Sequence, residues 1–127
     1  MKSINSPSAP TPIGPYSQAI LAGDFLFVSG HVGNEAQSGK IVEGGIAAQT
    51  KQVMENLGAI LKDAGLGFDD VIKCEIYLKD IADFKVVNGI YGSFFPNAHK
   101  PARQTMQVAA LPLGALIEIS CIAHFKK

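Results

Sequence analysis

The sequence has almost no arginine and no excess of charge of either sign. Its eleven basic side chains balance eleven acidic ones, and Arg103 is the only arginine among them. The lysines are scattered, with no run longer than the terminal pair. Proteins that bind nucleic acids or anionic membranes concentrate positive charge on one surface. The composition therefore argues against nucleic acid and against a membrane surface as partners.

Long apolar segments and paired cysteines are also lacking. No apolar run approaches the ~20 residues that span a bilayer, and the first residues show no signal-peptide core. Cys74 and Cys121, the two cysteines, stand far apart in apolar surroundings. We therefore expect buried free thiols in a reducing compartment, not a disulfide or a metal pair. A cytoplasmic location follows by default.

Motifs that mark common cofactor sites are missing as well. Phosphate-loop, zinc and nucleophile-elbow patterns are absent, and the glycines between residues 30 and 45 have neither dinucleotide nor Walker spacing. His31, His99 and His124 bring no carboxylate or thiol at ligand spacing. The sequence thus predicts no metal site.

What is present is typical of one packed domain spanning residues 1–127. A chain of 127 residues can sustain one hydrophobic core without the help of disulfides or bound metal ions. Hydrophobic residues make up 47% and charged residues 17%, which argues against disorder.

The hydrophobic pattern predicts a ββαβαββ order. Four prolines keep the first fifteen residues extended, and the glycine-rich residues 30–45 form a loop. The predicted strands cover residues 16–21, 24–29, 71–79, 102–110 and 116–125; one helix covers 46–64 and a second runs from its N-cap Asp83 to Pro96. We expect a two-layer α+β domain, a mixed sheet with both helices on one face. The apolar opposite face then needs a cover, which a homo-oligomer with inward-facing sheets would supply.

The single arginine lies at the start of an otherwise apolar strand. Alternation places Arg103, Thr105 and Gln107 on one face of this strand, while Glu118 and Ser120 share a face of the next. If the two strands form a hairpin, both sets could line one cleft. A guanidinium binds a carboxylate with two parallel hydrogen bonds, so Arg103 could grip a small carboxylate ligand. A structural ion pair between Arg103 and Glu118 at a subunit interface fits equally well, and periodicity alone does not choose.

Several segments match the motifs of a known family. They are residues 13–19 (IGPYSQA), 28–31 (VSGH), 73–80 (KCEIYLKD), Asn88 with Tyr91 and Phe94–Phe95, 101–103 (PAR), 108–112 (VAALP) and 117–119 (IEI). The chain resembles the Rid family, also called YjgF, whose older labels are translation inhibitor and L-PSP endoribonuclease. The Pro-Ala-Arg segment followed by Val-Ala-x-Leu-Pro is the most specific part of the match.

This resemblance implies a chorismate-mutase-like fold and a homotrimer, with a central barrel of strands and three clefts between subunits. It also implies an enzyme that hydrolyses reactive enamines and imines. The substrates would be 2-aminoacrylate and 2-iminobutanoate, and the products the 2-keto acids pyruvate and 2-oxobutanoate with ammonia. No metal or organic cofactor is expected.

Site residues follow from the same resemblance. Arg103 would bind the substrate carboxylate, Glu118 would orient or deprotonate the attacking water, and Tyr16 would close the pocket. The pocket wall would contain Ser29, Gly30 and Asn88, with Thr105 lining the cleft. Three positions depart from the common pattern: Thr105 replaces a frequent cysteine, Ser120 a second glutamate and His31 a glutamine. The loop at residues 96–100 is also shorter than in many members, so the preferred imine stays open.

Two other functions remain possible for such a chain. One is a translation inhibitor or endoribonuclease, as the older labels suggest. The neutral charge and the lack of an aromatic ladder weigh against it. The other is a non-catalytic trimer that binds keto acids or acts as a chaperone through the same clefts.

Overall fold

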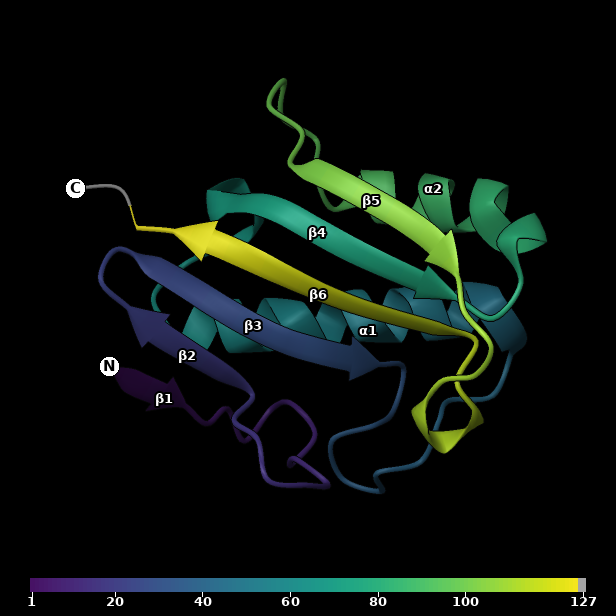
Figure 1. Cartoon of the computed structure of the whole chain (residues 1–127), viewed down its shortest axis with the longest axis horizontal. Coiled ribbons are helices and arrows are strands. Elements are labelled where there is room, and N and C mark those ends of the chain that lie inside the picture. Colours follow the sequence, from purple (N-terminus) through teal and green to yellow (C-terminus); the bar gives the residue numbers. More distant parts are fainter. Residues whose placement is uncertain (126–127) are drawn as a thin grey trace.

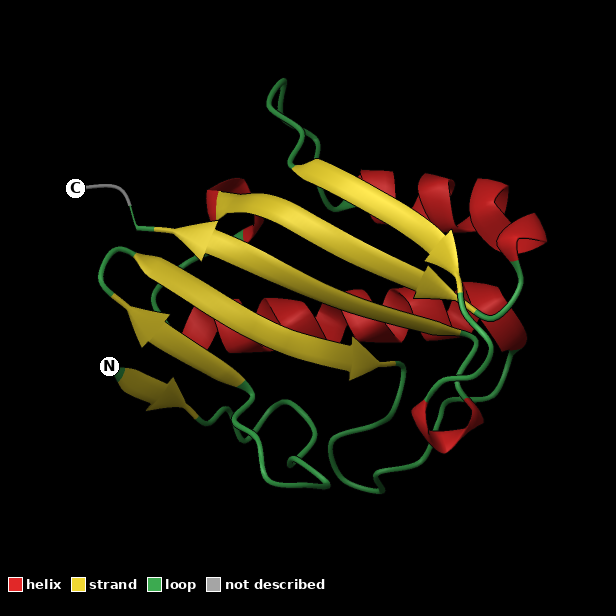
Figure 2. Ribbon diagram, in the orientation of Figure 1, coloured by secondary structure: helices red, strands yellow, loops and turns green. Residues whose placement is uncertain are grey.

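The computed structural model describes residues 1–125 as one mixed sheet with two helices packed behind it (Figure 1). The strands are β1 (Lys2–Ile4), β2 (Ala19–Ala22), β3 (Phe25–Val32), β4 (Val71–Leu78), β5 (Ala102–Gln107) and β6 (Ile117–His124). The helices are α1 (Gly45–Asp63) and α2 (Phe84–Ser93), and short 3-10 turns are η1 (Phe68–Asp70), η2 (Ile81–Asp83) and η3 (Pro112–Gly114). Both helices lie on the same face of the sheet (Figure 2), which confirms the predicted α+β architecture.

The strand order is β1-β2-β3-β6-β4-β5. Every neighbouring pair is antiparallel except β4 and β5, which are parallel. Parallel neighbours need a crossover connection, and α2 supplies it between these two strands. The last strand, β6, inserts between β3 and β4 and turns Ile117, Ile119 and Ala123 into the core without measurable exposure.

The N-terminal strands differ from the prediction. The structure adds β1, which precedes the prolines and pairs with β2, and β2 begins at Ala19 instead of Tyr16. Strand β3 continues to Val32, through residues that the glycine-rich pattern assigned to a loop. It does so because a register shift between Val28 and His31 accommodates Gly30, and bulges of this kind keep a strand paired while bending it.

The last two strands do not form the hairpin considered above. Strand β4 lies between β5 and β6, so these two strands do not pair. The segment that joins them contains the turn η3, where Leu113 and Gly114 have φ of 59° and 65°. Residues 108–116 carry the chain past the C-terminal end of β4 before β6 begins. The exposed side chains of Ala102 and Gln104 suit β5 to an edge of the sheet.

Helix α1 matches its predicted bounds to within one residue. Gly65 closes it with φ of 79°, where its N–H donates to the Lys62 carbonyl. At α2, Asp83 is the N-cap residue, as predicted, although its side chain accepts no capping hydrogen bond. The preceding turn η2 has its own N-cap, Asp80, whose side chain accepts from the Ala82 N–H at 2.9 Å.

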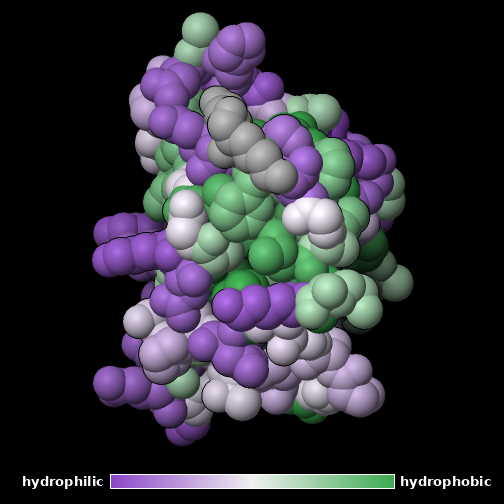
Figure 3. Space-filling view, turned by 90° about the vertical axis from the view of Figure 1, so that its left-hand side faces the viewer, coloured by the Kyte–Doolittle hydropathy of each residue, from purple (hydrophilic) through white to green (hydrophobic). Residues whose placement is uncertain are grey.

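The core lies between the helices and the sheet, and the opposite face of the sheet has no covering layer within residues 1–125. Large apolar side chains there remain accessible; Phe27, for example, is 47% exposed. Figure 3 looks onto the end of the molecule that holds the β2–β3 turn, where green apolar side chains reach the surface among polar ones. Within the described part of the chain, no helix is long and apolar enough to cross a bilayer.

Candidate functional site

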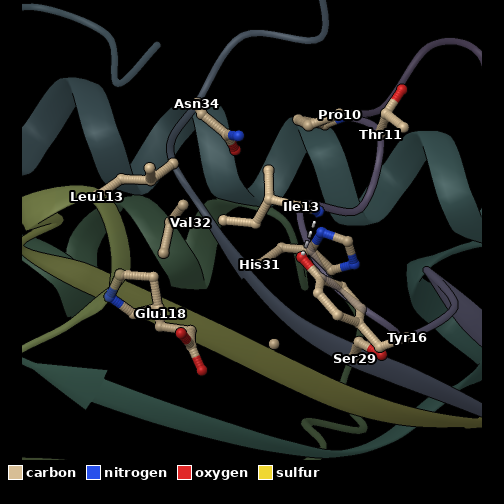
Figure 4. A pocket seen from close by; sticks show the side chains of 12 residues that line it. Pro10, Thr11, Ile13, Tyr16, Ser29, His31, Val32, Asn34, Leu113 and Glu118 are labelled. Carbon is tan, nitrogen blue, oxygen red and sulfur yellow. Dashed lines mark hydrogen bonds between the residues drawn. The ribbon is translucent and has the colours of Figure 1, made fainter. Parts of the chain in front are cut away.

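A pocket of about 310 Å³ opens where the end of β3 meets the start of β6. The segment before β2 and the turn η3 close its sides. Four predicted site residues line it, namely Tyr16, Ser29, Gly30 and Glu118 (Figure 4). The remaining lining residues are Pro10, Thr11, Ile13, His31, Val32, Asn34, Pro112 and Leu113.

The proline-rich wall of the pocket is held in place by Gln18. Its side chain is 2% exposed and accepts from the Ser6 N–H at 2.6 Å. It also donates to the carbonyl oxygens of Ser6 at 3.1 Å and Pro10 at 2.9 Å. Proline has no N–H, so a segment rich in proline depends on such side chains to satisfy its backbone. Gln18 lies in the family-like segment 13–19, but a lone amide before a strand gives no sequence signal of this structural role.

Tyr16 and Ser29 shape the mouth of the pocket. Tyr16 is well exposed, and its hydroxyl accepts a 3.4 Å hydrogen bond from the Ile13 N–H. The Ser29 hydroxyl donates to the Ser17 carbonyl at 2.7 Å, and the Ser29 N–H donates to the Gln18 carbonyl at 3.0 Å. Ser29 therefore uses its donors to tie β3 to the preceding segment.

The carboxyl group of Glu118 lies directly against Gly30. A Cβ atom added at Gly30 would collide with Oε2 of Glu118, so only glycine leaves room for this side chain. Burial raises the pKa of Glu118 above its ordinary value. Within residues 1–125 Glu118 accepts no hydrogen bond and forms no ion pair. Its carboxylate is thus available to handle a proton on a bound molecule.

His31 contributes an uncharged side chain to the lining of the pocket. It is buried, and its Nε2 lies 3.4 Å from the Gln18 carbonyl oxygen. Burial lowers the pKa of His31, with a smaller opposing effect from that hydrogen bond. The imidazole is therefore neutral near pH 7.

A second set of predicted residues lies around Arg103 on β5. The guanidinium Nη1 donates to Oδ1 of Asn88 on α2 at 2.8 Å. Its Cζ lies 5.3 Å from the ring centre of Phe84 and 5.2 Å from that of Tyr91. Among residues 1–125, no carboxylate pairs with Arg103.

The neighbours of Arg103 on the sheet are buried and mostly apolar. Thr105 shares its face, and the Thr105 hydroxyl is buried with no hydrogen-bond partner in the described chain. Cys74 and Cys121 face each other in register and are buried free thiols, as the sequence predicts. Burial raises the pKa of both, which keeps them protonated and unreactive. The described residues contain no cluster of three or more potential metal ligands.

The two sets of residues lie on opposite faces of the sheet. Arg103 is in register with Cys74, and Cys74 with Cys121, so all three face the helices. Glu118 precedes Cys121 by three positions and therefore faces the other way. The single cleft expected from a β5–β6 hairpin is thus not formed within one chain, and neither is an ion pair between Arg103 and Glu118.

Comparison with known proteins places the chain in a family. The family profile described as Endoribonuclease L-PSP matches residues 6–125. The chain belongs to this family. The predicted Rid, or YjgF, membership is thereby confirmed, since YjgF of Escherichia coli has the same fold.

Relatives of this Rid protein include named deaminases. It is 47% identical over 120 residues to the human 2-iminobutanoate/2-iminopropanoate deaminase, covering 94% of this chain and 87% of that one. It is 51% identical over 120 residues to the chloroplastic Reactive Intermediate Deaminase A of Arabidopsis thaliana, covering 94% and 64%. The crystal structure of E. coli TdcF with bound serine superposes with a TM-score of 0.94 at 36% identity, covering 99% of this chain and all of that one.

Proposed function

We propose that this protein hydrolyses short 2-imino acids, together with their enamine tautomers, to 2-keto acids and ammonia. One observation carries the proposal: within residues 1–125, neither Arg103 nor Glu118 has a partner of opposite charge. An unpaired guanidinium suits a substrate carboxylate, and a carboxyl with a raised pKa suits proton transfer. The names of the deaminase relatives point to the same chemistry.

The reaction needs both groups. Arg103 would bind the carboxylate of the imine through two parallel hydrogen bonds and so fix C2 against the pocket. Glu118 would take a proton from water as the water oxygen bonds to C2 of the C=N group. It would return that proton to nitrogen, which gives a carbinolamine. Glu118 would then move the proton of the new hydroxyl group to nitrogen as the C=O bond forms and the C–N bond breaks, releasing ammonia and the keto acid. A positioned general base typically contributes 10²–10⁴-fold, and orientation adds to this. No step requires a metal or an organic cofactor.

The site would be completed by assembly. Because Arg103 and Glu118 lie on opposite faces of one sheet, a single chain cannot bring them together. In the proposed homotrimer the uncovered sheet faces pack inward, and each of three clefts takes Arg103, Asn88 and Thr105 from one subunit. The neighbouring subunit supplies Tyr16, Ser29, Gly30 and Glu118. The apolar side chains on the uncovered face support this arrangement.

The direct test is a trapping assay. The imine 2-iminobutanoate is generated in situ and trapped with semicarbazide, and the protein should accelerate its loss. Arg103→Ala should lower kcat/KM by about 100-fold or more, because two charge-assisted hydrogen bonds are lost. Lys85→Ala, which removes an exposed cation from helix α2, is the matched control and should leave the rate unchanged. Failure of the wild type to accelerate imine loss would refute the proposal.

The same experiments separate the alternative functions. Binding of 2-oxobutanoate without faster imine hydrolysis would favour a non-catalytic keto-acid-binding or chaperone-like trimer. Salt-dependent RNA binding, with cleavage lost in Glu118→Gln, would favour an endoribonuclease, but the zero net charge argues against it. A cytoplasmic location also stays a prediction, which fractionation of cells would check.

A further inference from the structure

Three residues of α2 form a stripe that faces Arg103. Phe84, Asn88 and Tyr91 are spaced by four and then three positions, which places them on one side of a helix. All three contact the same guanidinium group. Nothing in their spacing alone identifies this role, because an aromatic stripe on a helix usually marks core.

The contacts hold Arg103 from several directions. The Phe84 and Tyr91 ring centres lie 5.3 Å and 5.2 Å from Cζ, within the ~6 Å range of a cation–π interaction. The Asn88 hydrogen bond at 2.8 Å then fixes the rotation of the guanidinium plane. We call these three residues the arginine clamp.

The arginine clamp orients the guanidinium without neutralising it. Two aromatic rings and an amide carry no net charge, and within the described chain no carboxylate approaches Arg103. A guanidinium has five N–H donors, and the hydrogen bond to Asn88 occupies one of them. A free arginine side chain also loses rotamer entropy when it binds a ligand, and a side chain already held loses less.

We propose that Phe84 and Tyr91 are positioning residues for the substrate carboxylate, and that Asn88 acts through Arg103 and does not itself contact substrate. The proposal rests on the function proposed above and explains how its anchor is preorganised. It assigns the aromatic stripe of α2 to ligand affinity in addition to packing.

The Tyr91 and Phe84 rings differ in burial, and therefore in how much the core depends on them. Tyr91 is buried in the core, where its hydroxyl has no hydrogen-bond partner among the described residues, so its removal would also disturb packing. Phe84 is 38% exposed and lies outside the core. Phe84 is therefore the position at which the clamp can be weakened while the fold is kept.

The test compares Phe84→Leu with two matched variants. Phe84→Leu keeps an apolar side chain but removes the π face, and it should raise KM for 2-iminobutanoate and Kd for 2-oxobutanoate about three- to tenfold. Phe84→Tyr, which retains a ring, should recover most of this loss. Val86→Ala changes another apolar residue of α2, 45% exposed and off the stripe, and should leave both constants unchanged. Calorimetric titration gives Kd, and thermal melting verifies that each variant is folded.

A double-mutant cycle shows whether Phe84 acts through Arg103. In the Arg103→Ala background, Phe84→Leu should have no further effect on kcat/KM or on Kd. An equal fold-loss in both backgrounds would overturn the proposal, as would a Phe84→Leu protein with wild-type Kd. If the wild type binds 2-oxobutanoate with this dependence on Phe84 yet hydrolyses no imine, the clamp stands and the proposed function fails.

Discussion

At the scale of single residues, the surroundings of Glu118 change its acid–base properties. Its carboxyl lies over a glycine, half-buried at the edge of a pocket and without a cation to stabilise its charge. Burial raises its pKa, so the proton is held more firmly than by an ordinary glutamate. Such a group is a stronger base when ionised.

The first prediction concerns the pH dependence of activity. Because the proposed mechanism uses the basic form of Glu118, kcat/KM should rise with pH through a limb that lies above the ordinary glutamate pKa of about 4.3. Glu118→Gln should lower kcat/KM by roughly 10²–10⁴-fold and abolish this limb. Rates of imine hydrolysis measured from pH 4 to 9 would check both. A limb that persists in Glu118→Gln would assign the titration to another group.

The same carboxyl should oppose folding when it is ionised. A group with a raised pKa in the folded state contributes stability that is present at low pH and is lost as pH rises through that pKa. Glu118→Gln should therefore raise Tm at pH 7 by a small amount, and the gain should shrink as the pH falls below the raised pKa. Thermal unfolding of both proteins at a series of pH values tests the sign.

Gly30 offers a second test at residue scale. Gly30→Ala would push the flexible end of Glu118 aside, so activity should fall at least tenfold while Tm changes little. Gly67→Ala is the control, because its added Cβ meets no atom within 4 Å and its backbone is extended. Loss of stability in Gly30→Ala without loss of activity would contradict the close approach of Glu118 to β3.

At the scale of elements, the wall of the pocket depends on one side chain. Gln18→Ala should leave the Ser6 N–H and the Pro10 carbonyl of the N-terminal segment unsatisfied, at a cost of about 1–3 kcal/mol. Hydrogen exchange should then speed up across residues 6–16, and chemical denaturation should show the lower stability. Gln37→Ala, at an exposed position, should change neither. Unchanged exchange in Gln18→Ala would mean that packing of the prolines holds the wall.

The elements also show how far the sequence could be interpreted. Helix α1 was predictable because Val53, Leu57 and Ile60 repeat at helical spacing and Gly65 ends it, all of which is local information. The position of β6 between β3 and β4 could not be predicted, because it depends on pairing between residues far apart in sequence. A hairpin of β5 and β6, considered from the sequence, would have placed Arg103 and Glu118 in one cleft of a single chain. The arginine clamp went unrecognised for the same reason, since it needs β5 beside α2.

At the scale of the whole molecule, the proposed cleft takes Arg103 from one subunit and Glu118 from its neighbour. This arrangement predicts complementation between inactive variants. If the protein is the proposed trimer, the Arg103→Ala and Glu118→Gln proteins, unfolded together and refolded as a one-to-one mixture, should regain about one quarter of wild-type activity. Half of the subunits supply an intact arginine and half of their neighbours an intact glutamate. Sedimentation of the wild type should give the mass of a trimer.

The control for this experiment is a mixture of the two variants that has not been unfolded, in which subunits have not exchanged. It should remain inactive on the timescale of the assay. If the refolded mixture also stays inactive while trimers form, the two groups do not come from different subunits, and the proposed cleft is wrong.

Among residues 1–125, Arg103 is held by neutral groups, so without substrate its counter-ion can come from solution. If Arg103 binds the substrate carboxylate as proposed, small anions of the medium, such as chloride, sulfate or acetate, should compete for its guanidinium. Apparent affinity for the imine should then fall as buffer anions are added, and the identity of the anion should matter as well as the ionic strength. The choice of buffer would then be part of the binding equilibrium.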